Sequence, residues 1–153
     1  EDNAIGVFPC TPATNLLYGL KEALRLLHAE GMDKVFSRHA RLAEATRLAV
    51  ETWGLENLCV VPEEYSNSLT AVIMPDGHDA DVLRKIILDR FDMSLGTGLG
   101  KIKGKVFRIG HLGDFNELML AGTLSGVEMG LGIAGIPHNK GGVSAALEFL
   151  AQE

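Results

Sequence analysis

The sequence predicts an α+β fold, an α/β sandwich in which a small, mostly antiparallel sheet packs with helices. Two stretches near the start carry apolar residues at helical spacing and are separated by a single glycine. Short apolar runs bounded by proline or glycine follow, as is typical of strands. Helical patterns then recur between and after these runs. The order of two helices, two strands, helix, strand and two helices favours this fold class.

The first two elements are predicted to be long helices. Pro12 stands where a first helical turn tolerates proline, and Thr11 before it has the chemistry of an N-cap. The helical spacing of leucines then continues to Gly31. A second helix is predicted from about residue 33 to 53, where Gly54 ends it.

Two strands and a third helix are predicted next. The apolar runs 58–61 and 69–74 are each closed by a proline and are interpreted as strands. A helix begins at Asp79 or Asp81, either of which can cap it. The glycine-rich stretch 93–104 follows as a loop.

This loop precedes a strand that contains Arg108. Its glycines have neither the phosphate-loop nor the dinucleotide-binding spacing, so we expect a flexible segment that covers a ligand near Arg108. Three alternating lysines here are interpreted as solvated loop residues, with an anion site as the alternative: Lys101, Lys103 and Lys105.

Two more helices complete the fold. Asp114 and Glu117 have N-cap and third-position spacing for a helix that runs to about residue 129. Within it, Gly122 and Gly126 are expected to permit close packing against the sheet. A short amphipathic helix is predicted at 143–150.

Composition excludes several classes of protein. The chain has 153 residues, 46% hydrophobic and 22% charged, which suits one domain with a core. A net charge of −6 without a basic stripe argues against a nucleic-acid binder. No apolar run reaches the roughly 18 residues of a membrane span, and no signal peptide opens the chain, so we expect a cytoplasmic protein. The lack of an initiator methionine suggests a fragment or a processed product.

Cysteine and histidine offer no metal site. Cys10 and Cys59 are expected to be free thiols. The five histidines have no metal-ligand spacing, and His28 and His39 are expected on solvated helix faces. His111, three residues after the strand arginine, either faces the same pocket as that arginine or is a turn residue.

Arg108 is the candidate binding residue. It lies inside an otherwise apolar strand, just before a glycine-rich turn. An arginine is costly to desolvate and does not lose its proton, so a half-buried one needs an anionic partner. A ligand carboxylate gripped by two parallel hydrogen bonds satisfies this need, and so does a salt bridge to an acidic helix. The residues alone leave both open.

Two segments carry a family resemblance: residues 8–24, FPCTPATNLLYGLKEAL, and 104–113, GKVFRIGHLG. They resemble class V PLP-dependent aminotransferases of the serine–glyoxylate and alanine–glyoxylate type. The resemblance covers nearly the whole chain but only the C-terminal part of the family's longer polypeptide. It implies the PLP-dependent type I architecture, with residues 1–30 as the end of the large domain and an interdomain helix. Residues 31–153 would then form the C-terminal small domain.

The resemblance also implies roles for three residues. Arg108 is expected to bind the α-carboxylate of the amino-acid or 2-oxo-acid substrate. Thr11 is expected to approach the phosphate of pyridoxal 5'-phosphate (PLP) in the neighbouring subunit of a homodimer. Phe8 stands where the family often has an aromatic hydroxyl, so that contact with the phosphate departs from the family pattern. The Schiff-base lysine and the acid on the pyridinium nitrogen lie upstream of the matched segment in the family.

The implied function is transfer of an amino group from serine, alanine or a similar donor to glyoxylate or another small 2-oxo acid. Because the reactive lysine is absent, the chain alone is expected to be inactive. One alternative is a stand-alone, non-catalytic module that binds a small carboxylate, as ACT-like domains do. Another is a truncated remnant without independent function, whose leading helices expose apolar surface and drive association.

Overall fold

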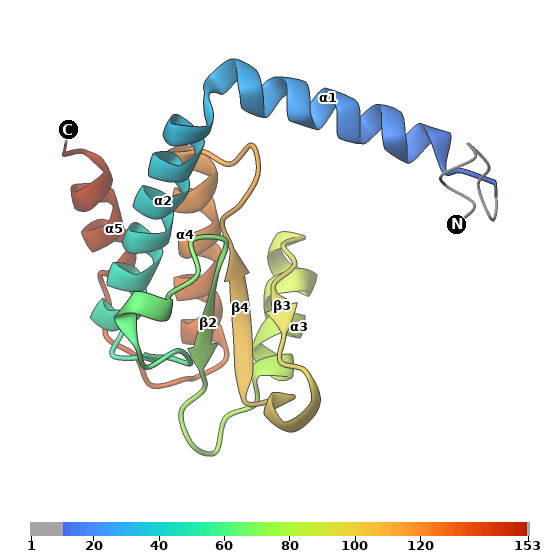
Figure 1. Ribbon diagram of the computed structural model, residues 1–153. Helices are drawn as coiled ribbons and strands as arrows, with labels where there is room; N and C mark the ends of the chain where they lie inside the picture. Colours follow the sequence, from blue (N-terminus) through green and yellow to red (C-terminus); the bar gives the residue numbers. More distant parts are fainter. Residues whose placement is uncertain (1–10, 153) are drawn as a thin grey trace. The chain divides into compact units, whose positions relative to one another are not determined.

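The computed structural model describes residues 11–152 and divides into two compact units, Glu1–Ser37 and Arg38–Glu153 (Figure 1). Helix α1, Thr14–Glu30, lies in the first unit and buries none of its residues. Its N-cap is Ala13, which makes no side-chain capping bond, so the predicted N-cap role of Thr11 is wrong. No helix among the described residues is both long and apolar enough to cross a bilayer.

The second unit contains a four-stranded sheet in the order β1-β2-β4-β3, with every pair antiparallel. The predicted fold class is confirmed. The strands are β1 at Glu56–Asn57, β2 at Leu69–Ile73, β3 at Gly96–Thr97 and β4 at Val106–Gly110.

The strand predicted at 58–61 is wrong. The Leu58 N–H donates to the Ala71 carbonyl, after which the chain leaves the sheet and forms a 3-10 turn, η2, at Pro62–Glu64. Val60 is 82% exposed. The run is apolar but has no partner surface to cover, and burial decides where a strand forms.

Helices cover one face of the sheet (Figure 1). They are the second-unit part of α2, which spans Met32–Thr52, together with α3 at Ala80–Phe91, α4 at Glu117–Ile133 and α5 at Gly142–Leu150. The side chain of Asp79 caps α3 by accepting from the Asp81 N–H. The cap of α4 is Asn116, whose side chain accepts from the Met119 N–H, so the predicted cap Asp114 is wrong.

The core lies between the sheet and these helices. Thr70 and Val72 of β2 pair with Ile109 and Phe107 of β4, and all four are buried. The helices and the turn directly after α2 contribute large buried side chains: Leu42, Trp53, Leu83, Ile87, Leu120, Leu124 and Leu131.

Glycines in α4 serve helix and loop contacts rather than sheet contacts. A Cβ on Gly126 would lie 2.6 Å from the Met93 methyl carbon. A Cβ on Gly122 would meet nothing within 4 Å. The predicted packing of these two glycines against the sheet is therefore wrong.

A carboxylate joins α4, α5 and the end of α2. Glu128 accepts hydrogen bonds from the Trp53 indole N–H at 2.7 Å, the Val143 N–H at 3.1 Å and the Gly141 N–H at 3.2 Å. Burial alone would raise the pKa of Glu128, but these hydrogen bonds and nearby His138 outweigh it and hold that pKa below its usual value. Its charge also favours the positive end of α5.

Replacing Glu128 by glutamine should destabilise the second unit. Glu128→Gln keeps the shape but loses the charge, so we expect the free energy of unfolding to fall by about 1–3 kcal/mol. Urea denaturation followed by tryptophan fluorescence measures this loss. Glu148→Gln, an exposed change on α5, is the matched control and should have little effect. Equal stability of the two variants would contradict the role of Glu128.

Candidate functional site

Arg108 lies on the sheet face opposite the helices. Strand side chains alternate between faces, so buried Phe107 and Ile109 on the helix side place Arg108 on the other. The register pairs Arg108 with Ala71 on β2 and with Gly96 on β3. Its neighbours on both sides are therefore the two smallest residue types.

Gly96 makes room for the arginine side chain. A Cβ at Gly96 would lie 3.0 Å from the Arg108 Cβ and 3.1 Å from its Nε, so the guanidinium end lies across this glycine. Sequence reasoning missed both Gly96 and Ala71 as site residues. Gly96 itself could have indicated the site, because a glycine inside a strand often marks the close approach of another group.

The guanidinium of Arg108 has unmet hydrogen-bonding capacity. Its Nε is buried and has no hydrogen-bond partner among the described residues. No carboxylate in the described part of the chain forms an ion pair with Arg108. The salt bridge to an acidic helix, one of the two readings of Arg108, is not present in residues 11–152.

A polar network attaches β3 to α3. The Thr97 hydroxyl donates to Asp81 Oδ1 at 3.0 Å, and Arg84 Nη1 donates to the same oxygen at 2.7 Å. The hydrogen bond from Thr97 and, next in size of effect, the one from Arg84 lower the pKa of Asp81. Arg84 Nε also donates to the Leu95 carbonyl. The stretch 93–104 thus contains a strand and a 3-10 turn, η3 at Gly100–Ile102, instead of structureless loop.

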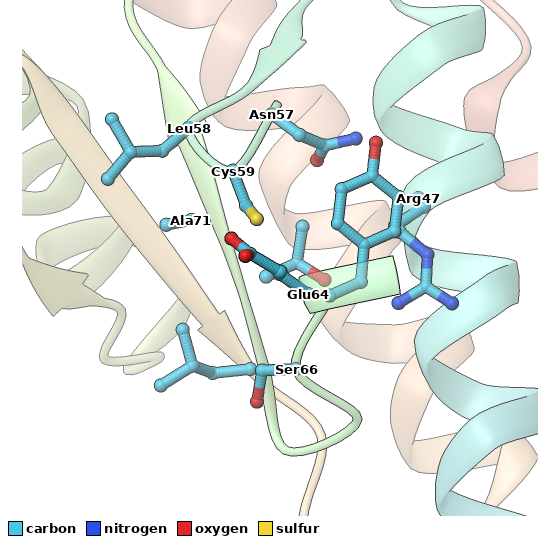
Figure 2. Close-up of a pocket in the computed structure, with 10 residues that line it drawn as sticks. Arg47, Asn57, Leu58, Cys59, Glu64, Ser66 and Ala71 are labelled. Atoms are coloured by element: carbon cyan, nitrogen blue, oxygen red, sulfur yellow. The ribbon is translucent and has the colours of Figure 1, made fainter. Parts of the chain in front are cut away.

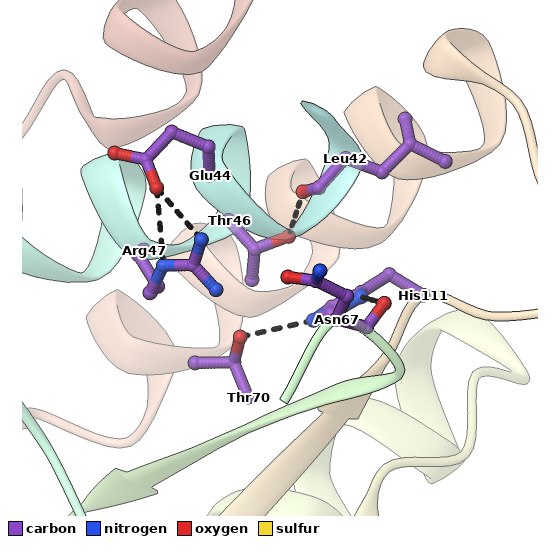
Figure 3. Close-up of polar contacts among 7 residues, drawn as sticks. All are labelled: Leu42, Glu44, Thr46, Arg47, Asn67, Thr70 and His111. Atoms are coloured by element: carbon purple, nitrogen blue, oxygen red, sulfur yellow. Dashed lines mark hydrogen bonds and ion pairs between the residues drawn. The ribbon is translucent and has the colours of Figure 1, made fainter. Parts of the chain in front are cut away.

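His111 lies on the other side of the sheet from Arg108. It is fully buried, with Nε2 3.0 Å from the Thr70 hydroxyl oxygen and Nδ1 3.2 Å from the Asn67 carbonyl oxygen (Figure 3). It does not face the arginine, and it is a buried residue directly after β4 instead of a turn residue. Burial lowers its pKa to about 4, and the positive charge of Arg47 acts in the same direction.

The predicted positions of the remaining histidines, the loop lysines and Cys59 are confirmed in all cases except His39. His28 is exposed, as predicted. His39 is half-buried and its Nε2 accepts from the Gly113 N–H, so its predicted solvated position is wrong. The three loop lysines are exposed: Lys101, Lys103 and Lys105. Cys59 is a free thiol.

Two site residues implied by the resemblance, and one cysteine, lie at the start of the chain. Thr11 is exposed, just before α1. Phe8 and Cys10 lie outside the described residues. Within residues 11–152, no three His, Cys, Asp or Glu side chains form a group that could hold a metal ion.

Comparison with solved structures defines the class of this fold. A crystal structure of pyridoxamine–pyruvate aminotransferase from Mesorhizobium loti superposes with a TM-score of 0.87 at 34% identity, over 94% of this chain and 37% of that one. The fold of this chain is that of the C-terminal domain of PLP-dependent aminotransferases.

Sequence comparison is more specific. The chain is 47% identical to the serine–glyoxylate aminotransferase of Methylorubrum extorquens over 153 residues, which is 99% of this chain and 38% of that protein. It is 52% identical to the Arabidopsis thaliana enzyme of the same name over 145 residues, or 94% of this chain and 36% of that protein. No family model matches. The resemblance is thus confirmed: the chain is a homologue of class V aminotransferases of the serine–glyoxylate type and spans a little over a third of their length.

Because of His111, the free energy of unfolding should decrease as the pH is lowered. Its pKa is lowered from 6.5 to about 4 on folding, so the unfolded chain binds more protons between these values. The stabilising contribution is full above pH 6.5 and is lost progressively toward pH 4, by at most about 3 kcal/mol. Urea unfolding at a series of pH values measures the slope.

The His111→Gln variant isolates this effect. It should lose the part of the slope between pH 6.5 and 4. His28→Gln, at an exposed position, should keep the slope of the parent chain. A slope that survives in His111→Gln would refute the assignment.

A methyl group at Gly96 should disturb Arg108. Because the new Cβ would press on the arginine Cβ, we expect Gly96→Ala to shift the Arg108 side-chain resonances and lower stability by about 1–2 kcal/mol. Gly122→Ala is the matched control, since its Cβ enters open space on a helix. That control should stabilise by roughly 0.5–1 kcal/mol. Unchanged Arg108 signals in Gly96→Ala would show that the glycine is not needed.

Proposed function

We propose that this chain supplies the residue that binds the substrate carboxylate in a PLP-dependent aminotransferase. The reaction would move an amino group from serine, alanine or a similar donor to glyoxylate or another small 2-oxo acid. The names of the relatives support aminotransferase chemistry and glyoxylate as an acceptor. The observation that carries the proposal is the half-buried Arg108, which has no counter-charge in the part of the chain that the structure describes.

Arg108 binds the carboxylate of the substrate and fixes its orientation. Its planar guanidinium presents parallel N–H groups that match the two carboxylate oxygens. Gly96 and Ala71 have no large side chain to cover the guanidinium, so a small substrate can reach it from the sheet face that the helices leave open. A carboxylate held in one orientation also keeps the α-carbon of the substrate in one position.

The residues of this chain fit only part of a PLP site. Thr11 precedes α1, whose N-terminus has no side-chain cap, and this agrees with a hydroxyl contact to a phosphate. Every lysine of the chain is exposed, whereas a lysine that reacts with a cofactor carbonyl is activated by desolvation or a neighbouring cation. When bound, PLP supplies the electron sink for loss of the α-proton. The lysine that anchors it comes from outside these residues.

The same proposal includes the assembly. Residues 1–30 would belong to the end of the large domain and an interdomain helix, and 31–153 to the small domain of a homodimeric enzyme. Thr11 would then reach the phosphate in the neighbouring subunit. The exposed leucines of α1 support a helix that is covered in the assembled protein: Leu16, Leu17, Leu20, Leu24 and Leu26.

A chimeric enzyme tests the role of Arg108. The chimera is the M. extorquens aminotransferase with this chain in place of its matching segment. Its serine–glyoxylate transamination is measured. Arg108→Lys keeps the charge but loses the planar fork, so kcat/KM should fall roughly a hundredfold. PLP loading, read from its absorbance, should not change.

Arg90→Lys is the matched control, an exposed arginine near the end of α3, and should leave kcat/KM unchanged. An Arg108→Lys chimera with full catalytic efficiency would remove the carboxylate role. Transamination by this chain alone with added PLP would show that its own lysines suffice, against the proposal.

A further inference from the structure

Strand β3 supports the side chain of Arg108. A Cβ built on Gly96 would lie 3.0 Å from the Cβ, 3.1 Å from the Nε and 3.5 Å from the Cζ of Arg108. The arginine side chain therefore lies along the backbone of Gly96, and its Nε is buried there. Contacts that fix the position of Gly96 thus also fix the direction in which the guanidinium points.

The neighbour of Arg108 on the other side gives it less support. The register places Ala71 of β2 beside Arg108, and Ala71 lines a cavity of about 240 Å³ together with Leu58 (Figure 2). A single methyl group beside a cavity does not restrict the rotamers of a long arginine side chain. The order of Arg108 therefore depends mainly on β3.

Strand β3 has little stability of its own. It contains only Gly96 and Thr97, lies at an edge of the sheet and pairs with β4 alone. So short a pairing offers few backbone hydrogen bonds to offset the entropy lost when the chain is ordered. An attachment outside the sheet is needed, and helix α3 provides it.

Asp81 and Arg84 attach both chain neighbours of Gly96 to α3. Asp81 Oδ1 accepts from the Thr97 hydroxyl at 3.0 Å and from Arg84 Nη1 at 2.7 Å. Arg84 Nε donates to the Leu95 carbonyl at 2.8 Å. Leu95 and Thr97 are thus held on the helix side of the sheet. Because side chains alternate along a strand, Gly96 between them faces the open side.

The first turn of α3 also holds the far end of the segment that joins β3 to β4. The Ala80 N–H donates to the Gly104 carbonyl at 2.8 Å. A Cβ on Gly104 would lie 3.2 Å from Oδ1 of Asp79, the cap of α3. Residues 95–104 are therefore attached to α3 at both ends. Loss of the Asp81 link releases the end that lies under Arg108.

We propose that Asp81 and Arg84 are positioning residues for substrate binding by Arg108. They lie on the helix side of the sheet and act through β3, which they keep against the arginine side chain. A guanidinium that is ordered in advance loses less entropy when it binds a carboxylate, so the network raises substrate affinity without entering the chemical step. This role rests on the function proposed for Arg108.

The Thr97→Val variant tests the attachment without changing any charge. Valine keeps the branched shape and the preference for a strand, but it cannot donate to Asp81. In the full 153-residue chain, hydrogen exchange of the Arg108 Nε–H, followed by nuclear magnetic resonance, should become roughly tenfold faster. Thr97→Ser keeps the hydroxyl and should exchange at nearly the parent rate. Equal rates in the two variants would overturn the proposal.

Asp81→Asn and Asp89→Asn are a matched pair on α3. Each removes a carboxylate charge that forms an ion pair within the helix at 2.7 Å, with Arg84 and Lys85 respectively. Only the first carboxylate is bonded to β3, so Asp81→Asn should speed exchange of the Arg108 Nε–H and Asp89→Asn should not. An equal effect of both variants would show that the charge of α3 governs Arg108, against the proposal.

The chimeric enzyme connects the order of Arg108 to substrate binding. Thr97→Val should raise the KM for serine roughly tenfold, while kcat at saturation and PLP loading stay near the parent values. Thr97→Ser should keep the parent KM. If Arg108→Lys loses efficiency but Thr97→Val keeps the parent KM, the positioning role alone is overturned. If Arg108→Lys keeps full efficiency, the carboxylate role fails and the positioning role fails with it.

Discussion

The register between β2 and β4 is the constraint on which the other features depend. It places Val72 opposite Phe107 and Thr70 opposite Ile109, so one face of the sheet is covered by helices. The same register leaves Arg108 beside Ala71 on the opposite face. A slip of one residue would bury the guanidinium in the core and expose Phe107, and the cost of that exchange keeps the strands in place.

Two arginines of this small unit have a buried nitrogen without a hydrogen-bond partner in the described residues, and their surroundings differ. On the open face, Arg108 lies over a glycine and has no anionic partner among residues 11–152. At the edge of β2, the guanidinium of Arg47 is already paired with Glu44 and stacked on Tyr65. The first has its full charge available for a carboxylate.

Much of the fold could be predicted from the sequence, and its errors have physical causes. Periodicity identified α3, β2 and β4, because each buries one face against the core. The strand predicted at 58–61 was wrong because apolar residues form a strand only where they can pack on a neighbouring surface. Asp114 failed as a cap because Asn116, two residues later, meets the first turn of α4 in the required extended conformation. Arg108 was predicted as a binding residue, but Gly96 and Ala71 were not, since only the sheet brings them to it.

Both edges of this sheet end in strands of two residues, β1 and β3. Such short edges offer too few consecutive N–H and C=O groups for a second chain to add in register. Thr97 on β3 is also tied to the neighbouring helix through Asp81. The architecture can therefore keep one sheet face accessible to small molecules while resisting the edge-to-edge polymerisation that leads to fibrils.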